Sequence, residues 1–185
     1  QRNKKEIINY GNKNVCNKMF IRGGGIVDIY VRNLKNNKSN FFTVEIIVNC
    51  LEAMGANLLN EIAEKMSIYL NNQKYILQKP ILRVLSNLSI YRKATAEFKI
   101  DLVNLTTEKI DGYDLANLIV KANQIAEDDP FRASTHNKGI MNGIDAVAIA
   151  LGQDFRAIEA GIHAYASIDP DNYSYSDYRP LRSEE

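Results

Sequence analysis

The hydrophobic residues of the first hundred positions follow two different periods. Alternating apolar and polar residues predict strands where the apolar ones are β-branched or aromatic, and apolar residues every three or four positions predict a helix. On this basis we expect helices at 3–20 and 52–70 and strands at 26–31, 41–48, 82–88 and 94–100. This order of elements indicates an α+β fold, in which helices cover one face of an antiparallel sheet.

The helix expected over 52–70 has the clearest pattern. Its apolar residues recur every four positions from Met54 to Met66 and form one face. Gly55 lies in its first turn, where glycine lowers helix stability by about 1 kcal/mol. Small residues at this place have two interpretations, which are close packing against a sheet and the approach of a phosphate to the free N–H groups of the helix start. The pattern alone supports both equally.

From residue 104 onward the pattern is helical. Helices are expected at 114–127, 141–151 and 155–166. Pro130 ends the first of them, because the residue before a proline disfavours helix. The second is apolar on nearly all sides, so we expect it to be buried. The change of pattern predicts two domains, residues 1–103 and 104–185.

The composition is that of a globular protein. Of the 185 residues, 45% are hydrophobic and 24% are charged, which argues against disorder. Cys16 and Cys50 lack metal-ligand spacing and are expected to be reduced thiols, so no metal site is predicted. No apolar run approaches the ~20 residues that span a bilayer, and no secretory signal opens the chain. We therefore expect a cytoplasmic protein with no membrane partner.

Basic residues are concentrated near the start of the chain. Nine lysines and arginines stand against two acidic residues in positions 1–40. On charge alone this is most simply a solvated basic face, and a surface facing the phosphates of a nucleotide or of CoA is the second interpretation. A noncatalytic nucleotide- or RNA-binding module using this face is our alternative function. No motif of aromatic and basic residues for RNA is visible, so nucleic acid is not the expected partner.

Charged residues also occur in a block of small and apolar residues at 130–166. Arg132, Lys138 and Asp154 lie there beside glycines, in two small-residue loops that are each expected to open a helix. Burying a charge is costly unless it is paired, so a core has no use for these three residues. Paired charges beside small residues are what a site for an anionic substrate needs.

The same block carries a family resemblance. Residues 132–145 read Arg-Ala-Ser-Thr-His-Asn-Lys-Gly-Ile-Met-Asn-Gly-Ile-Asp, and 152–166 read Gly-Gln-Asp-Phe-Arg-Ala-Ile-Glu-Ala-Gly-Ile-His-Ala-Tyr-Ala. Together they resemble the active-site signature of class II hydroxymethylglutaryl-CoA (HMG-CoA) reductases. Residues 52–57, Glu-Ala-Met-Gly-Ala-Asn, are similar to that family's cofactor motif Asp-Ala-Met-Gly-x-Asn, with Glu52 in place of the aspartate. The segment 83–88 resembles another family segment, whose asparagine, here Asn87, lies beside the nicotinamide.

The resemblance implies a fold and a reaction. It makes residues 1–103 a small NAD(P)-binding domain of ferredoxin-like type, with its first strand missing. Residues 104–185 become a mainly helical part of the large catalytic domain that binds the CoA substrate. The implied reaction is the four-electron reduction of HMG-CoA to mevalonate and CoA in isoprenoid biosynthesis, by a homodimer or higher homo-oligomer. The reverse, degradative direction is the alternative.

The resemblance also assigns roles to residues. Lys138 takes the position of the catalytic lysine, whose charge stabilises the oxygen of the carbonyl group as hydride arrives. Asp154 matches the catalytic aspartate that holds this lysine. Arg132 suits the free carboxylate of the substrate, and Asn142 is a second substrate contact. The family also uses a glutamate upstream and a histidine in a C-terminal segment. Neither is found in this chain, so we expect the 185 residues alone to be inactive.

Cofactor binding is assigned to a second group of residues. These are Lys18, Glu52, Met54, Gly55, Ala56, Asn57 and Asn87. NADH-selective relatives carry an aspartate shortly before the triple glycine, where it can bind the ribose hydroxyls. Residues 7–27 contain no Asp or Glu but include Lys13, Lys18 and Arg22. Such cations favour a 2′-phosphate, so NADPH is the expected cofactor and NADH the alternative.

Overall fold

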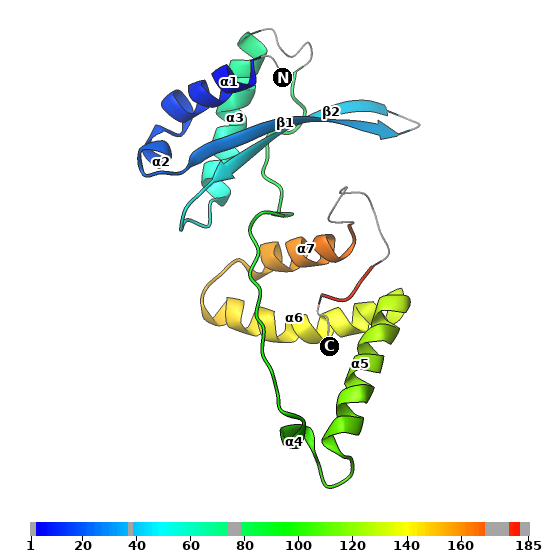
Figure 1. Ribbon diagram of the computed structural model, residues 1–185. Helices are drawn as coiled ribbons and strands as arrows, with labels where there is room; N and C mark the ends of the chain where they lie inside the picture. The colour runs from blue at the N-terminus through cyan, green and yellow to red at the C-terminus, as the bar shows by residue number, and fades with distance from the viewer. Residues whose placement is uncertain (1–2, 37–38, 74–78, 169–177, 182–185) are drawn as a thin grey trace. The chain divides into compact units, whose positions relative to one another are not determined.

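The computed structural model describes residues 3–36, 39–73, 79–168 and 178–181. They fall into two compact units, Gln1–Leu85 and Ser86–Glu185 (Figure 1). The first unit mixes helices with a two-stranded antiparallel sheet, and the described part of the second is helical. The α+β class is therefore confirmed at this level. The ferredoxin-like arrangement is not confirmed.

The first unit is a β-hairpin covered by helices. Its elements are α1 (Lys4–Tyr10), the π-helical turn η1 (Gly11–Val15), α2 (Asn17–Ile21), β1 (Gly25–Asn36), β2 (Ser39–Asn49) and α3 (Ala56–Asn72). The strands pair antiparallel with Ile29 opposite Ile46, and the register shifts at a β-bulge between Ile26 and Asp28. The strands predicted at 26–31 and 41–48 are confirmed, and both are longer than predicted.

The core of this unit lies between the hairpin and the helices. Ile26 and Ile29 of β1 belong to one buried cluster with Ile62 and Met66 of α3. Complete burial of such side chains stabilises the fold by roughly 2 kcal/mol each. The four-residue period of the sequence therefore identified the correct face of α3 at Ile62 and Met66.

The start of α3 differs from the prediction. Gly55 has φ 93°, a left-handed conformation outside the helix, and α3 begins at Ala56 rather than at 52. Met54 consequently lies before the helix and is exposed instead of lying on its apolar face. The glycine therefore marks the boundary of this helix and does not belong to its first turn.

The N-terminal helical segment is interrupted, whereas the sequence predicts one helix at 3–20. It breaks into α1, η1 and α2, and the π-helical turn lies against β1. The buried Asn12 side chain accepts a hydrogen bond from the Ile26 N–H (2.7 Å) and donates one to the Ile26 carbonyl (2.9 Å). A Cβ at Gly11 would lie 2.4 Å from Ile26 Cδ1 and 3.0 Å from Met66 Sδ. Glycine and asparagine at these two positions therefore let the turn approach the strand closely.

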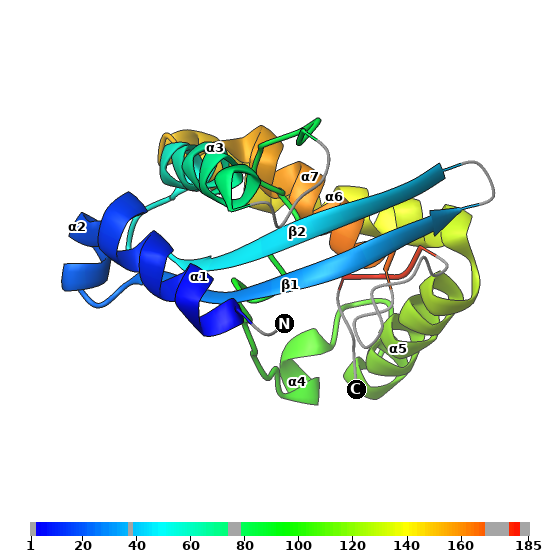
Figure 2. The ribbon, with the colours of Figure 1, turned by 90° about the horizontal axis from the view of Figure 1, so that it is seen from above.

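The hairpin continues beyond the helices that cover it, as Figure 2 shows. Val31 and Val44 follow the buried Ile29 and the partly buried Ile46 on the same face, because alternate residues of a strand share a face. Both valines are exposed, and so is Phe42 beyond them. The apolar face of the hairpin is thus longer than the helix layer of this unit.

The second unit begins with extended chain and continues as helices. These are α4 (Leu102–Leu105), α5 (Gly112–Asp128), α6 (Pro130–Ala150) and α7 (Phe155–Ala166). The side chain of Asp111 accepts a hydrogen bond from the Tyr113 N–H (2.9 Å) and caps the start of α5. Helix α6 packs against α5 on one side and α7 on another. The helices predicted at 114–127 and 155–166 are confirmed.

The two strands predicted at 82–88 and 94–100 are wrong. Within the described residues, this stretch contains bends and a turn but no strand. Leu82 is 80% exposed and Phe98 is 70% exposed. An alternating pattern becomes a strand only when a neighbouring strand pairs with its backbone, and no described segment does so here.

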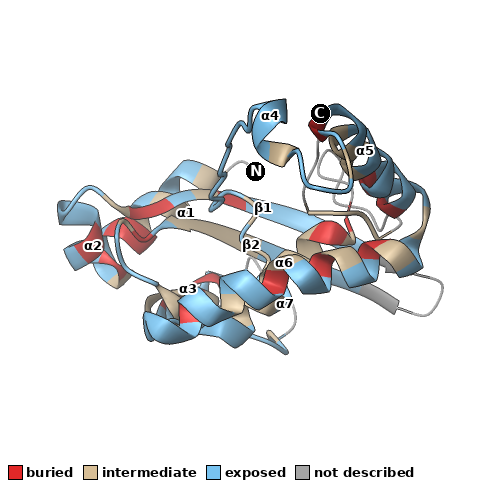
Figure 3. Ribbon diagram, turned by 90° about the horizontal axis from the view of Figure 1, so that it is seen from below, coloured by how far each residue is buried: buried red, intermediate tan, exposed pale blue. Residues whose placement is uncertain are grey.

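Helix α6 corrects two further predictions. Residues 130–140 are helical rather than a loop, because the Asp129 side chain accepts from the Phe131 N–H (3.0 Å) and Pro130 suits the first helical position. The helix is also only partly buried. Met141 and Ala148 are enclosed, but Val147 is 60% exposed. In Figure 3 the buried positions alternate with exposed ones along its length. No helix of the described segments is long and apolar enough to cross a membrane.

Residues 178–181 lie across α6 and α7. The fully buried Asn137 side chain donates to the Arg179 carbonyl (2.8 Å) and accepts from the Leu181 N–H (2.9 Å). The Arg179 guanidinium donates to the Tyr165 carbonyl (3.1 Å). The Tyr178 hydroxyl contacts Nδ1 of His163. These contacts hold the segment against the helix that carries Lys138.

Candidate active site

Helix α6 carries three of the predicted site residues. Lys138 and Asn142 are four residues apart and both are exposed, so they lie on neighbouring turns of one side. Arg132 precedes Lys138 by six residues, which rotates it by about 120° around the helix axis. The helix therefore brings Lys138 and Asn142 together and presents Arg132 on another side.

Asp154 lies at the start of α7. Its carboxylate accepts a hydrogen bond from the Ala157 N–H (3.2 Å) and caps the helix. Twelve residues separate Lys138 from Ala150, the last residue of α6, which is a rise of about 18 Å along the axis. Of the ion pairs among the described residues, none joins Lys138 to Asp154. The structure does not bring these two residues together.

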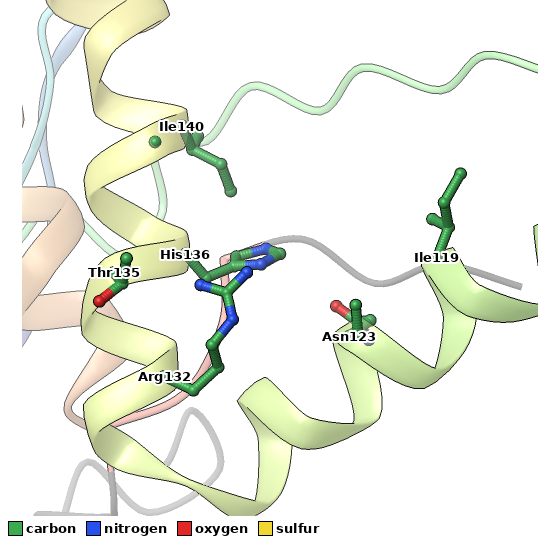
Figure 4. Close-up of a pocket in the computed structure, with 8 residues that line it drawn as sticks. Ile119, Asn123, Arg132, Thr135, His136 and Ile140 are labelled. Atoms are coloured by element: carbon green, nitrogen blue, oxygen red, sulfur yellow. The ribbon is translucent and has the colours of Figure 1, made fainter. Parts of the chain in front are cut away.

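Arg132 faces a groove between α5 and α6 (Figure 4). The groove has a volume of about 510 Å³ and is lined by Ile119, Ala122, Asn123, Arg132, Thr135, His136, Gly139 and Ile140. Along α6 the lining runs from Arg132 to Ile140 and does not include Lys138. Within the described part of the chain, Arg132 forms no ion pair, so its guanidinium can bind an added anion.

The predicted cofactor motif lies at the start of α3. Gly55 is the N-cap residue in a left-handed conformation, and no described side chain caps the first N–H groups of the helix. A Cβ at Gly55 would lie 2.7 Å from Cys50 Sγ, so a larger residue does not fit there. Met54 and Asn57 are exposed beside it and Ala56 is half-buried. Free N–H groups on a helix start attract phosphate.

Two cations of the α2 segment lie near this helix. Arg22 Nη2 is 4.0 Å from Glu52 Oε2, and both side chains are largely exposed. Lys65, hydrogen-bonded to Glu61, lowers the pKa of the Glu61 carboxyl, and the positive charge of Lys18 contributes in the same direction. The first half of α3 thus has Lys18 and Arg22 within electrostatic reach.

Asn87 lies in the second unit, against α7. A Cβ at Gly161 would be 2.6 Å from the Asn87 carbonyl oxygen, so glycine is required for this approach. The Asn87 side chain itself is exposed. The glycine in the 152–166 motif therefore has a packing reason, which the sequence pattern did not reveal.

One residue of the groove was missed by sequence reasoning. Asn123 is 4% exposed, and its Oδ1 is buried without a hydrogen-bond donor among the described residues. A sequence signal did exist, because Asn123 follows the apolar side of α5 that includes Ile119 and Ala122.

Comparisons with known proteins agree with one another. The hydroxymethylglutaryl-coenzyme A reductase family profile matches residues 2–179. The 3-hydroxy-3-methylglutaryl-coenzyme A reductase of Archaeoglobus fulgidus is 40% identical over 185 residues, which is 100% of this chain and 39% of the relative. A probable reductase of Borreliella burgdorferi is 38% identical over 146 residues, covering 79% of this chain and 33% of its own length.

Solved structures give the same result. A 3-hydroxy-3-methylglutaryl-coenzyme A reductase of Streptococcus pneumoniae superimposes with a TM-score of 0.79 at 36% identity, covering 97% of this chain and 46% of the other. The class II enzyme of that species bound to NADPH in open conformations gives 0.78 at 37% identity, with the same coverage. The chain spans less than half of each of these relatives. Since the family profile covers nearly the whole chain and the site motifs lie inside it, this chain belongs to the hydroxymethylglutaryl-coenzyme A reductase family.

Proposed function

We propose that this chain is part of a class II reductase that converts HMG-CoA to mevalonate and CoA with NADPH. The observation that carries the proposal is the placement of Lys138 and Asn142 on one exposed side of α6, inside the matched family region. The activity belongs to the protein that supplies the remaining catalytic groups.

The chemistry asks for a fixed positive charge. Each hydride that reaches the thioester or aldehyde carbon leaves negative charge on the carbonyl oxygen, and an ammonium group near that oxygen lowers the barrier. Lys138 serves this purpose in our proposal, with Asn142 as a neighbouring hydrogen-bond donor. Arg132 binds the free carboxylate of the substrate through its forked donors. Asp154 is proposed to hold Lys138 by an ion pair. Because it lies at the start of α7, away from Lys138, this pairing requires a rearrangement of α6 and α7.

The lysine is tested by mutation. In the full-length protein that contains this chain, Lys138→Ala should lower kcat for HMG-CoA-dependent NADPH oxidation by several orders of magnitude, since charge stabilisation is a large part of such catalysis. Lys121→Ala removes an exposed lysine of α5 and is the control, with activity expected to be unchanged. Equal activity of the two variants would reject the proposed role of Lys138, and no oxidation by a folded unmutated protein would reject the reductase assignment.

We further propose that the start of α3 binds the phosphates of NADPH, which supplies the hydride when bound. Two features support this, the uncapped N–H groups after Gly55 and the nearby cations Lys18 and Arg22. Asn87 is proposed to contact the nicotinamide. From the family membership we also propose that residues 1–103 form the cofactor domain and 104–185 part of the catalytic domain of a cytoplasmic homo-oligomer.

The cofactor preference has its own test. Lys18→Ala should raise the KM for NADPH about tenfold and leave the KM for NADH unchanged, because one charge-assisted contact to the 2′-phosphate is lost. Lys5→Ala, on α1, is the control for a general loss of positive charge. A lower KM for NADH than for NADPH in the unmutated enzyme would contradict the preference.

A further inference from the structure

The groove between α5 and α6 contains two groups that need opposite partners. The Arg132 guanidinium has only hydrogen-bond donors and forms no ion pair within the described segments. Asn123 Oδ1, on the opposite wall, is an acceptor that is buried and receives no donor from the described residues. In Figure 4 the oxygen of Asn123 is on the side that faces Arg132 and His136.

A hydrogen bond on the side away from the groove fixes the orientation of the Asn123 side chain. Its Nδ2 donates to Glu127 Oε1 at 2.9 Å, one turn further along α5. This bond uses the donor end of the amide and leaves the oxygen as the end that lines the groove. A buried acceptor without a donor costs about 1–3 kcal/mol, so its persistence in a groove calls for a bound group that donates to it.

We propose that this groove receives the hydroxy-acid end of the substrate, with Asn123 as the residue that recognises the hydroxyl group. The carboxylate of such a group binds Arg132, and the hydroxyl proton is donated to Asn123 Oδ1. One small molecule then satisfies both walls, whereas an anion without a hydrogen-bond donor, such as sulfate, satisfies Arg132 alone. The inference rests on the proposed reductase function and adds a specificity-determining residue to it.

The dimensions of the groove agree with this assignment. Its volume of about 510 Å³ lies within the range of small-ligand sites. It extends along α6 from Arg132 to Ile140, and Lys138 lies on the neighbouring side of the same stretch of helix. The groove therefore accounts for the hydroxy-acid end of the substrate and not for its reacting carbonyl group.

The test removes the hydroxyl from the ligand and the acceptor from the protein. In the full-length enzyme, 3-methylglutaryl-CoA, which lacks the 3-hydroxyl, should bind about tenfold more weakly than HMG-CoA, the effect of one hydrogen bond to a buried partner. Asn123→Leu should abolish this difference, because it weakens the binding of HMG-CoA and leaves the binding of 3-methylglutaryl-CoA unchanged. Asn117→Leu, at an exposed position of the same helix, should leave the difference intact.

Thermal unfolding separates recognition from a structural role. Because Asn123→Leu removes an unsatisfied buried acceptor, its Tm should equal or exceed that of the unmutated protein, and Asn123→Ala provides a second variant if leucine packs poorly. An unchanged preference for the hydroxylated ligand in either variant would overturn the inference while leaving the reductase assignment standing. An unmutated enzyme that binds neither ligand would overturn both.

Discussion

Two buried asparagines perform the same task in different places. Asn12 bonds both backbone groups of Ile26, and Asn137 bonds the Arg179 carbonyl and the Leu181 N–H. Each side-chain amide offers one donor and one acceptor, so it pairs with backbone in the way that a neighbouring strand does. Backbone groups that would otherwise be buried without partners are thereby satisfied.

The contribution of Asn12 can be measured. Asn12→Ala leaves the N–H and C=O of Ile26 buried without these bonds, so the free energy of unfolding should fall by about 3 kcal/mol. Urea denaturation of the chain measures this change. Asn14→Ala is the matched control, because Asn14 is exposed and donates only to the Tyr10 carbonyl. Equal losses in the two variants would mean that the bonds to β1 carry no special weight.

At the scale of elements, the unbroken length of α6 decides which site residues meet. One rigid helix from Pro130 to Ala150 carries Arg132, Lys138 and Asn142. Its period of 3.6 residues joins the last two and turns the first toward α5. Asp154, at the start of α7, lies beyond the C-terminal end of α6. A loop at 130–140, as the sequence predicts, would have let all of these residues converge.

The packing of α7 against residues near Asn87 gives a prediction at the same scale. Gly161→Ala places a Cβ 2.6 Å from the Asn87 carbonyl oxygen, so backbone must shift, and unfolding free energy should fall by about 1–3 kcal/mol. Amide hydrogen exchange around Asn87 should also accelerate. Gly143→Ala, at a helical position with open space, should instead stabilise by about 1 kcal/mol. A stabilised Gly161→Ala variant would disprove the close contact.

At the scale of the whole molecule, each of the two compact units exposes a large amount of apolar surface. In the second unit, Val103, Val147 and Leu151 are exposed. Contiguous apolar patches are typical of surfaces that other protein segments cover. The relatives are more than twice as long as this chain. The proposed activity is therefore to be tested in the full-length protein that contains this chain.

The hairpin, the apolar face of α3, the helices α5 and α7, and the family can all be predicted from the sequence. Each of these follows from a local hydrophobic period or from an ungapped motif. Both kinds of signal are independent of contacts between distant residues. Three other features depend on the three-dimensional arrangement of the chain. Residues 82–88 and 94–100 remain without strand pairing, because a strand needs a partner that periodicity cannot supply. Arg132 and Lys138 occupy different sides of α6, because a single helix spans both. Asn123 became a site residue because α5 packs beside α6 and directs its amide oxygen into their groove.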